Sequence, residues 1–372
     1  MTGRVVARLS ELVDNFDLRR RPVKSSDRGH GRYPYYGASG VVDFIDKHIY
    51  DGEYLLISED GENLRTRATP IAFLARGQFW VNNHAHVVRA NRRSDTRYLM
   101  YHLAYLDISG YLTGSTLPKL TRSAMDSIIL NIPSPADQVA IGRVLGALDD
   151  KIAANAELAR TADELSRACF DRAMTRPGRT ESLLFDRFDV AFGEPFRGSL
   201  FSEVGVGRPL IRIRDLYTCA PKLWSTESRV RETLVQAGDV LIGMDAEFTP
   251  VVWLGEDGLL NQRVCKVVGR DNLSRVTTRL ALTRPISAIE SEKSGTTVIH
   301  LNKGDLERTR VELPSEHTLE EFDHLANPLH DLTVSLAEES RRLASLRDTL
   351  LPHLMSGRMR VRDAEKTVSD AV

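Results

Sequence analysis

Basic side chains that could contact a polyanion occur in two parts of the chain, each in front of a long amphipathic stretch. Arginine and lysine neutralise DNA phosphates, and an arginine in a loop can also read base edges. The chemistry predicted from these residue types is DNA binding. The predicted contact residues are Arg19, Arg20, Lys24, Arg65, Arg67 and Lys119 in the first part and Arg212, Arg214, Arg263 and Lys303 in the second.

The local settings of the first cations differ. Arg19 and Arg20 begin a run of basic residues that extends to Arg32, and a solvated charged loop is the alternative to DNA-backbone contact there. Arg65 and Arg67 follow a Gly-Glu-Asn turn in a loop, which is a reasonable place for base-edge readers.

The second set lies on a predicted strand and in a repeated segment. Residues 209–216 alternate apolar and polar and predict a strand with Arg212 and Arg214 on its polar face, an arrangement that is also typical of a plain solvated face. Lys119 and Lys303 lie in two similar segments that each begin Gly-Ser/Thr-Thr.

No metal site or catalytic site is predicted. His84 and His86 could share a metal ion, but no cysteine or aspartate cluster completes a ligand set. The sequence contains no GxGxxG, no GxxxxGK[ST] and no Asn/Asp-Pro-Pro-aromatic run. Catalysis by this chain alone is therefore not expected, and no cofactor is predicted to bind to it.

Composition is that of a globular protein of more than one domain. The 372 residues are 42% hydrophobic and 27% charged, with a net charge of −1. Residues 1–134 carry 18 basic and 14 acidic side chains, whereas 315–372 carry 7 and 11. This distribution suits phosphate contact by globular parts and protein contact by helices. No apolar run spans a bilayer and no leader opens the chain, so a cytoplasmic location is expected.

Two long helices are predicted to position these globular parts. Residues 315–361 follow a three-four apolar spacing through Leu325, Leu332 and Leu343, which predicts a helix packed lengthwise on another. Residues 134–174 supply the partner, with Leu158 and Leu165 extending its apolar face. An ordinary helix on a globular core is the alternative.

The segments in front of the two helices repeat each other. The spacing from Gly114 to Pro133 equals that from Gly295 to Pro314. Upstream, the Gly-acid-aliphatic run at Gly52 matches that at Gly238, and 82–84 match 261–263. Three matched features in one order predict a two-fold internal duplication.

With these features, the sequence resembles the specificity (S) subunit of type I restriction–modification systems. The run LRDTLLPHLMSGRMRV at 346–361, the run GTTVIHLNKGDL at 295–306 and the repeated plan of globular domain plus long helix carry the resemblance. The tail of the first copy, 166–179, lacks a clean counterpart of the first run.

The resemblance implies an α+β fold with a pseudo-two-fold repeat and an antiparallel coiled coil. It implies target-recognition domains at 1–134 and 176–314, spacer helices at 135–175 and 315–361, and a disordered tail at 362–372. It also implies a non-catalytic subunit that reads a bipartite, asymmetric site in double-stranded DNA. Two methyltransferase subunits and restriction subunits would bind it, and these partners would hold S-adenosylmethionine, ATP and Mg²⁺.

Two other functions remain open from the sequence. One is a DNA-modifying enzyme with an unrecognised site, which a methyl-transfer assay on the single chain would reveal. The other is a coiled-coil scaffold without a DNA role, which a salt-dependent DNA-binding assay would separate from a reader.

Overall fold

The chain forms two compact units, described here from a computed structural model that covers residues 3–29, 31–293 and 299–371. The first unit comprises Met1–Asp150 with Leu343–Val372, and the second comprises Lys151–Arg342. Gly295, which begins the second repeated segment in the sequence, lies outside the described residues.

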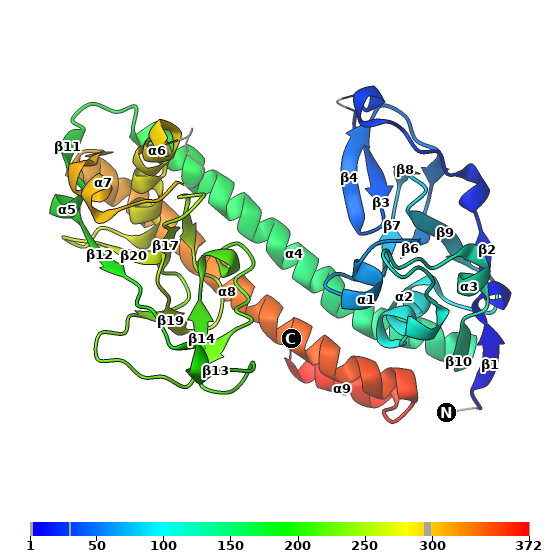
Figure 1. The fold of residues 1–372 in the computed structure, drawn as a ribbon. Helices are drawn as coiled ribbons and strands as arrows, with labels where there is room; N and C mark the ends of the chain where they lie inside the picture. Colours follow the sequence, from blue (N-terminus) through cyan, green and yellow to red (C-terminus); the bar gives the residue numbers. More distant parts are fainter. Residues whose placement is uncertain (1–2, 30, 294–298, 372) are drawn as a thin grey trace. The chain divides into compact units, whose positions relative to one another are not determined.

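Each unit contains a four-stranded antiparallel sheet with the same strand order (Figure 1). The central strands are the matched Gly-acid-aliphatic runs, and they are fully buried because both faces of the sheet are covered. In the first unit the order is β2(Val13–Asn15), β9(Ala85–Ala90), β6(Tyr54–Ser58), β7(Ala72–Ala75). In the second it is β12(Phe188–Phe192), β20(Val264–Gly269), β17(Val240–Gly243), β18(Pro250–Val252).

A second sheet in each unit contains one parallel pair, β3 with β8 in the first unit and β14 with β19 in the second. In order, the strands of the first are β4(Gly40–Ile45), β3(Tyr33–Gly37), β8(Gln78–Val81), β5(Tyr50–Asp51). Those of the second are β13(Phe201–Ser202), β15(Trp224–Ser225), β14(Arg208–Ile211), β19(Gly258–Leu260), β16(Leu234–Val235).

The strand predicted over 209–216 is shorter than expected. It ends at Ile211, and Ile213–Asp215 is a turn of 3₁₀ helix. Asp215 causes the change, because its carboxylate accepts hydrogen bonds from the backbone N–H and from Nε of Arg212, both at 3.1 Å.

Helices complete each copy in the same order. α2(Thr96–Tyr105) and α6(Arg275–Lys293) pack on the four-stranded sheets, and short helices α3(Arg122–Asp126) and α7(Lys303–Arg308) follow. A two-stranded antiparallel ribbon then leads into each long helix: β1(Val5–Arg8) with β10(Ile129–Ile132), and β11(Thr180–Leu183) with β21(Arg310–Leu313). The remaining short helices are α1(Asn63–Thr66) and α5(Leu184–Arg187). The duplication predicted from the sequence is confirmed.

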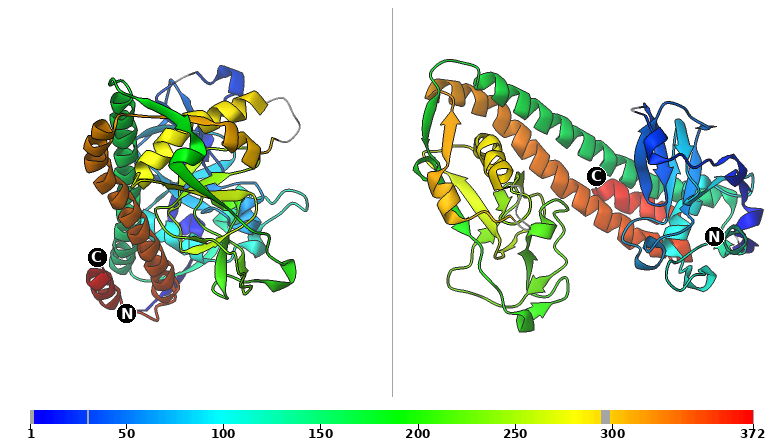
Figure 2. Two further views of the ribbon diagram at one scale, coloured as in Figure 1. Left: turned by 90° about the vertical axis from the view of Figure 1, so that its left-hand side faces the viewer. Right: turned by 45° about the horizontal axis from the view of Figure 1, so that its top comes forward.

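The long helices α4(Pro135–Ala173) and α8(Glu316–Ser356) pack antiparallel, as predicted (Figure 2). In the first unit Arg347 of α8 pairs with Asp149 of α4 at 2.6 Å, and in the second Asn155 donates to Glu339 at 2.7 Å. Residue numbers fall along one helix as they rise along the other. Gly357, at φ 77°, ends α8 in the left-handed conformation typical of a helix C-terminus.

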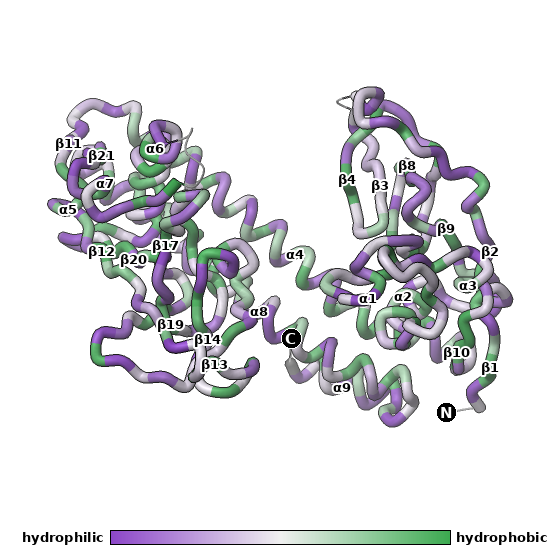
Figure 3. The backbone as a smooth tube through the Cα atoms, in the orientation of Figure 1, coloured by the Kyte–Doolittle hydropathy of each residue, from purple (hydrophilic) through white to green (hydrophobic). Residues whose placement is uncertain are grey.

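The predicted seam between these helices is partly wrong. Leu158, Leu165, Leu325 and Leu332 were expected to face the partner helix, but all four are exposed. Smaller residues such as Asn155, Ala162, Ser166 and Ala326 are buried instead, because they let the two backbones approach closely. Hydrophobic and hydrophilic residues alternate along α4 and α8 in Figure 3.

The tail predicted to be disordered forms a helix, α9(Val361–Ala371). Ala364 is buried, and Glu365 pairs with Arg143 of α4 at 3.5 Å. Within the described part of the chain, no helix has the length and apolar character needed to cross a membrane.

Candidate nucleic-acid interface

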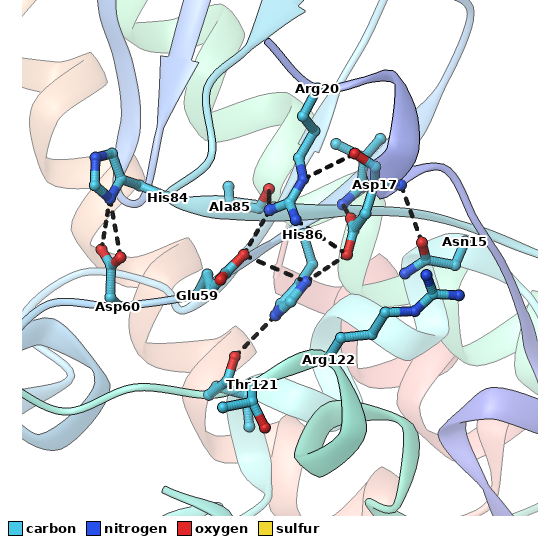
Figure 4. A network of polar contacts seen from close by, with 12 residues as sticks. Asn15, Asp17, Arg20, Glu59, Asp60, His84, Ala85, His86, Thr121 and Arg122 are labelled. Atoms are coloured by element: carbon cyan, nitrogen blue, oxygen red, sulfur yellow. Dashed lines mark hydrogen bonds and ion pairs between the residues drawn. The ribbon is translucent and has the colours of Figure 1, made fainter. Parts of the chain in front are cut away.

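The first unit gathers connected charged side chains where β6 ends and β9 begins (Figure 4). Glu59 and Asp60 follow β6 directly and are hydrogen-bonded to the loop that leads into α3. Leu120 of that loop donates its backbone N–H to the carbonyl oxygen of Glu59 at 2.8 Å, and Asp60 forms a β-bridge with Lys119. Two exposed loops are therefore held side by side.

The buried side chain of His86 links this edge to Asp17 and to the loop that leads into α3. Nδ1 of His86 lies 2.7 Å from the Asp17 carboxylate, and Nε2 lies 2.8 Å from the Leu120 carbonyl oxygen. Each ring nitrogen therefore faces an oxygen acceptor, which fixes the orientation of the ring. Burial raises the pKa of Asp17, but the hydrogen bond and charge of His86, together with the Val87 N–H and Arg20, leave it below its usual value.

Arg20 joins the same network. Its Nη1 donates to Glu59 at 2.6 Å and to the Ala85 carbonyl oxygen at 2.8 Å, and its Nη2 lies 3.4 Å from Asp17. Burial raises the pKa of Glu59, but the Arg20 hydrogen bond and the charges of His86 and Arg20 bring it below its usual value. A phosphate contact by Arg20 would require breaking these bonds, so its observed contacts position the loops.

Arg65 and Arg67 are likewise engaged within the unit. Arg67, at φ 49°, donates to carbonyl oxygens at the C-terminus of α2, including Ala104 at 2.9 Å and Leu106 at 2.5 Å. Arg65 donates to the carbonyl oxygens of Gly114 and Ser115 at 3.0 and 3.1 Å while remaining exposed.

Arg19 and Lys24 lie close to Arg20 in the sequence. The Arg19 guanidinium donates to the Ile49 carbonyl oxygen and lies 5.0 Å from the centre of the Tyr50 ring. Lys24 is exposed, and its ammonium has no hydrogen bond or ion pair to any residue that the structure describes. Lys119 is half-exposed and lies 3.3 Å from Glu59.

The second unit repeats the acid-cation pairing at the equivalent edge. Asp60 and Asp245 each lie two residues beyond the central strand of the four-stranded sheet. Asp60 pairs with His84 at 2.9 Å, and Asp245 pairs with Arg263 at 3.7 Å and with His300 at 2.5 Å. His300 also forms the β-bridge to Asp245 that Lys119 forms to Asp60, so His300 is the counterpart of Lys119.

The other cations predicted in the second unit are not brought to one point. Arg212 is held by Asp215, whereas Arg214 is exposed. Lys303 begins α7 and lies 3.5 Å from Glu307. Its counterpart is Arg122, the first residue of α3, and not Lys119.

No group of three or more His, Cys, Asp or Glu side chains suited to a metal ion occurs within 3–29, 31–293 and 299–371. His84 and His86 face different acids, Asp60 and Asp17, on different sides of β9's start. The described side chains at this edge offer both hydrogen-bond donors and acceptors.

Comparison with known proteins agrees with this geometry. Residues 3–161 match the family described as type I restriction modification DNA specificity domain. A Haemophilus influenzae protein assigned as a type I restriction enzyme specificity subunit is 36% identical over 141 residues, which are 38% of this chain and 36% of that protein. The chain resembles type I specificity subunits.

Two further specificity subunits match. The EcoBI subunit of Escherichia coli is 30% identical over 182 residues, 48% of this chain and 38% of that protein. The MjaIX subunit of Methanocaldococcus jannaschii is 21% identical over 371 residues, 89% of this chain and 85% of that protein. The chain thus spans little more than a third of the length of the first two specificity subunits in these alignments.

A solved structure supports the fold of the whole chain. The type I restriction–modification S subunit from M. genitalium superposes with a TM-score of 0.63 at 14% identity, covering 94% of this chain and 96% of that one. Compared with the residues predicted from the sequence, the structure adds Asp60 and Asp245 to the candidate site. An acid two residues after each matched strand was the signal that could have revealed them.

Proposed function

We propose that this chain is the DNA specificity subunit of a type I restriction–modification complex. The observation that carries the proposal is the repetition of one unit, with the same sheet order and the same loop-edge pairing, in a chain whose first copy matches the specificity-domain family. Each unit would read one part of an interrupted DNA site.

The chemistry of the two edges supports an asymmetric site. The first edge presents Asp60 with His84 and Lys119, and the second presents Asp245 with Arg263 and His300. Since donors and acceptors in different positions select different base edges, the two half-sites should differ in sequence.

The proposal includes partners that supply all catalysis. Two methyltransferase subunits would dock on the units and the α4–α8 helix pair, and restriction subunits would complete the complex. S-adenosylmethionine, ATP and Mg²⁺ would bind to those partners, and the assembly would act on DNA in the cytoplasm.

Methylome sequencing tests the proposal. Deleting the gene should remove one interrupted, non-palindromic methylated motif from the host genome, and restoring the gene should return it. A palindromic motif, or a methylome unchanged by the deletion, would exclude the function. Methyl transfer by the purified single chain would instead support an enzyme.

A further inference from the structure

Two exposed valines lie beside the turn of a β-hairpin in the first unit. β3 and β4 form this hairpin, and Ala38 and Ser39 make the turn between them (Figure 1). Val41 and Val42 follow the turn and are 47% and 55% exposed. Adjacent exposed aliphatic side chains keep apolar surface in water at a cost in free energy, and such a surface often marks a binding site. We call Val41 and Val42 the valine tip.

The turn of the hairpin is hydrogen-bonded to the strand that leads into the candidate site. Ser58 is the last residue of β6, and its hydroxyl donates to the carbonyl oxygen of Ala38. Asp60 lies two residues beyond Ser58 and pairs with His84 (Figure 4). The backbone that carries Asp60 therefore also holds the turn beside the valine tip.

Val42 is also close to the segment that carries His84. A Cβ atom added at Gly37 would lie 2.9 Å from Cγ1 of Val42 and 3.3 Å from Nδ2 of Asn82, so these two side chains flank the same glycine. Oδ1 of Asn82 accepts the backbone N–H of His84 at 2.8 Å. The valine tip is therefore continuous with the edge that presents Asp60 and His84.

A β-bulge sets the position of Val42. In the described ladder of β3 and β4, Tyr36 lies opposite Val41 and Tyr35 lies opposite Asp43, which leaves Val42 without a residue opposite it. A bulge bends its strand and changes the direction of a side chain, and bulges are frequent beside active sites. The backbone thus places Val42 outside the regular ladder, where its side chain stays exposed at the edge of the site.

The composition of the hairpin does not suit a phosphate contact. From Gly37 to Ile45 the only charged residue is Asp43, and its carboxylate lies 3.6 Å from the guanidinium of Arg28. Phosphate oxygens are bound by cations and by hydrogen-bond donors. The major groove also presents one apolar group, the C5 methyl of thymine, which apolar side chains contact. The valine tip has the chemistry to contact that methyl group.

The second unit has a different surface at the equivalent position. The carbonyl oxygens of Tyr36 and Ile211 accept the backbone N–H groups of Asn82 and Asn261, each at 3.0 Å, so Tyr36 and Ile211 are counterparts. After Ile211 the chain forms a turn of 3₁₀ helix and then exposes Tyr217, whose hydroxyl donates to a carboxylate at 2.6 Å. An apolar base contact at this position is therefore expected from the first unit alone.

We propose that the valine tip contacts the C5 methyl group of a thymine in the half-site read by the first unit. The inference rests on the proposed function, and it deepens that function by naming the base group that this part of the surface selects. Asp60 and His84 select by hydrogen bonding, and the valine tip selects by apolar contact at another base pair of the same half-site.

Duplex DNA that carries the methylated motif is the probe, with each thymine of the motif replaced in turn by deoxyuridine, which lacks only the C5 methyl. At one position the replacement should weaken binding by the full-length wild-type chain about fourfold, the factor expected when one buried methyl group is lost. V41S/V42S should bind the thymine and uracil duplexes equally, which makes the protein and DNA changes non-additive. Fluorescence anisotropy measures all four affinities.

V5S/V6S is the matched control, because Val5 and Val6 are also adjacent, exposed valines on a strand of the first unit. This variant should keep the fourfold difference between the thymine and uracil duplexes. If urea unfolding shows that V41S/V42S is not folded, V42S replaces it, since Val42 lies outside the regular ladder. V42S should lose most of the same difference.

Equal wild-type affinity for thymine and uracil at every position would overturn the inference. So would a loss of affinity in V41S/V42S that is the same for both duplexes, which is the result expected of a wedge between base pairs. A defect of V41S/V42S in assembly with partner proteins alone would also overturn it. A wild-type chain that does not prefer the motif duplex to other DNA would instead refute the proposed function, and the inference would fall with it.

Discussion

At the scale of single residues, the first unit contains two buried histidines in different surroundings. His86 lies between the Asp17 carboxylate and the Leu120 carbonyl oxygen, whereas His102 is buried beside Tyr98 and Arg4. Tyr98 accepts from Arg4 and donates to Nδ1 of His102, which requires a neutral ring. Burial, with a smaller contribution from the Arg4 charge, lowers the pKa of His102 to about 4.

His102 should make the first unit acid-sensitive. Its pKa is lower in the folded chain than the usual 6.5, so the unfolded state binds more protons and stability falls as the pH drops below 6.5 toward 4. The loss should be about 2 kcal/mol between pH 7 and pH 5. Urea unfolding of wild type and H102L at both pH values measures it. H317L, at an exposed histidine, should retain the full pH dependence, and an H102L variant that retains it would contradict the assignment.

Lys24 and Arg20 should separate DNA contact from loop positioning. Lys24 is unpaired among the described residues, so K24A should weaken binding to all DNA sequences and reduce the salt slope by about 0.9 without changing stability. R20A should cost about 2 to 4 kcal/mol of folding free energy, because it removes a largely buried guanidinium that donates to Glu59 and to the Ala85 carbonyl oxygen and lies 3.4 Å from Asp17. Salt titrations of DNA affinity and urea unfolding of both variants provide the measurement. Equal effects of the two variants on both quantities would refute the distinction.

Asp60 should select a base in one half-site only. A carboxylate at a groove-facing edge accepts from the amino group of cytosine, and replacing it relaxes that position at a cost of roughly 1–3 kcal/mol. D60N should therefore allow more than one base at one position in one half of the methylated motif, and D245N should have the same effect in the other half. E62Q, at an exposed neighbour, should leave the motif intact. A motif unchanged in both aspartate variants would remove them from the reading surface.

At the scale of elements, the Asp149 carboxylate of α4 is hydrogen-bonded to both neighbouring helices, α2 and α8. Asp149 accepts from the hydroxyl of Tyr101 on α2 and from Arg347 of α8 at 2.6 Å. Burial and the Asp149 hydrogen bond raise the pKa of Tyr101, so the tyrosine remains a donor at all ordinary pH values.

D149A should destabilise the first unit by about 2 to 4 kcal/mol, because the buried Tyr101 hydroxyl loses its acceptor and the half-buried Arg347 guanidinium keeps only the exposed Asp348. The neighbouring Asp150 is a matched control: it pairs with Arg97 at 2.9 Å but is more exposed, so D150A should cost under about 1 kcal/mol. Denaturant unfolding compares them. Equal losses would mean that Asp149 does not anchor the helix.

The elements also show where sequence reasoning works. The runs that begin at Gly52 and Gly238 were predicted to be matched repeats, and they form the equivalent buried strands β6 and β17, because continuous aliphatic runs suit strands covered on both faces. The helix pair was predicted, but leucines such as Leu158 and Leu325 were wrongly expected at the interface between the two helices. Close packing favoured Ala162 and Ser166, and side-chain size alone does not reveal which row faces the partner.

The candidate site was harder to predict than the fold. Arg20 and Arg67 are as cationic as Lys24 in the sequence, and only their partners, which lie far along the chain, reveal that they hold loops in place. Helix α9 was missed because its few apolar residues cover a surface that only the folded helix pair provides.

At the scale of the whole molecule, α4 is unbroken from Pro135 in the first unit to Ala173 in the second, so its length should set the spacer between half-sites. Four residues inserted after Ile152 add about 6 Å of helix and slightly more than one full turn, roughly 1.1 turns. Coiled coils accommodate such an insertion by local unwinding. With DNA rising about 3.4 Å per base pair, the unread spacer should grow by roughly one or two base pairs while both half-sites stay unchanged.

A two-residue insertion at the same place is the control. It rotates the following part of α4 by about half a turn, which moves Ala162, Ser166 and Phe170 out of the seam and brings the exposed row of Leu158 and Leu165 toward it. That variant should lose stability and methylation activity together. Methylome sequencing of cells carrying each insertion gives the bases of both half-sites and the length of the spacer between them. If the four-residue insertion altered the bases read, or left the spacer at its original length, α4 would not act as a ruler.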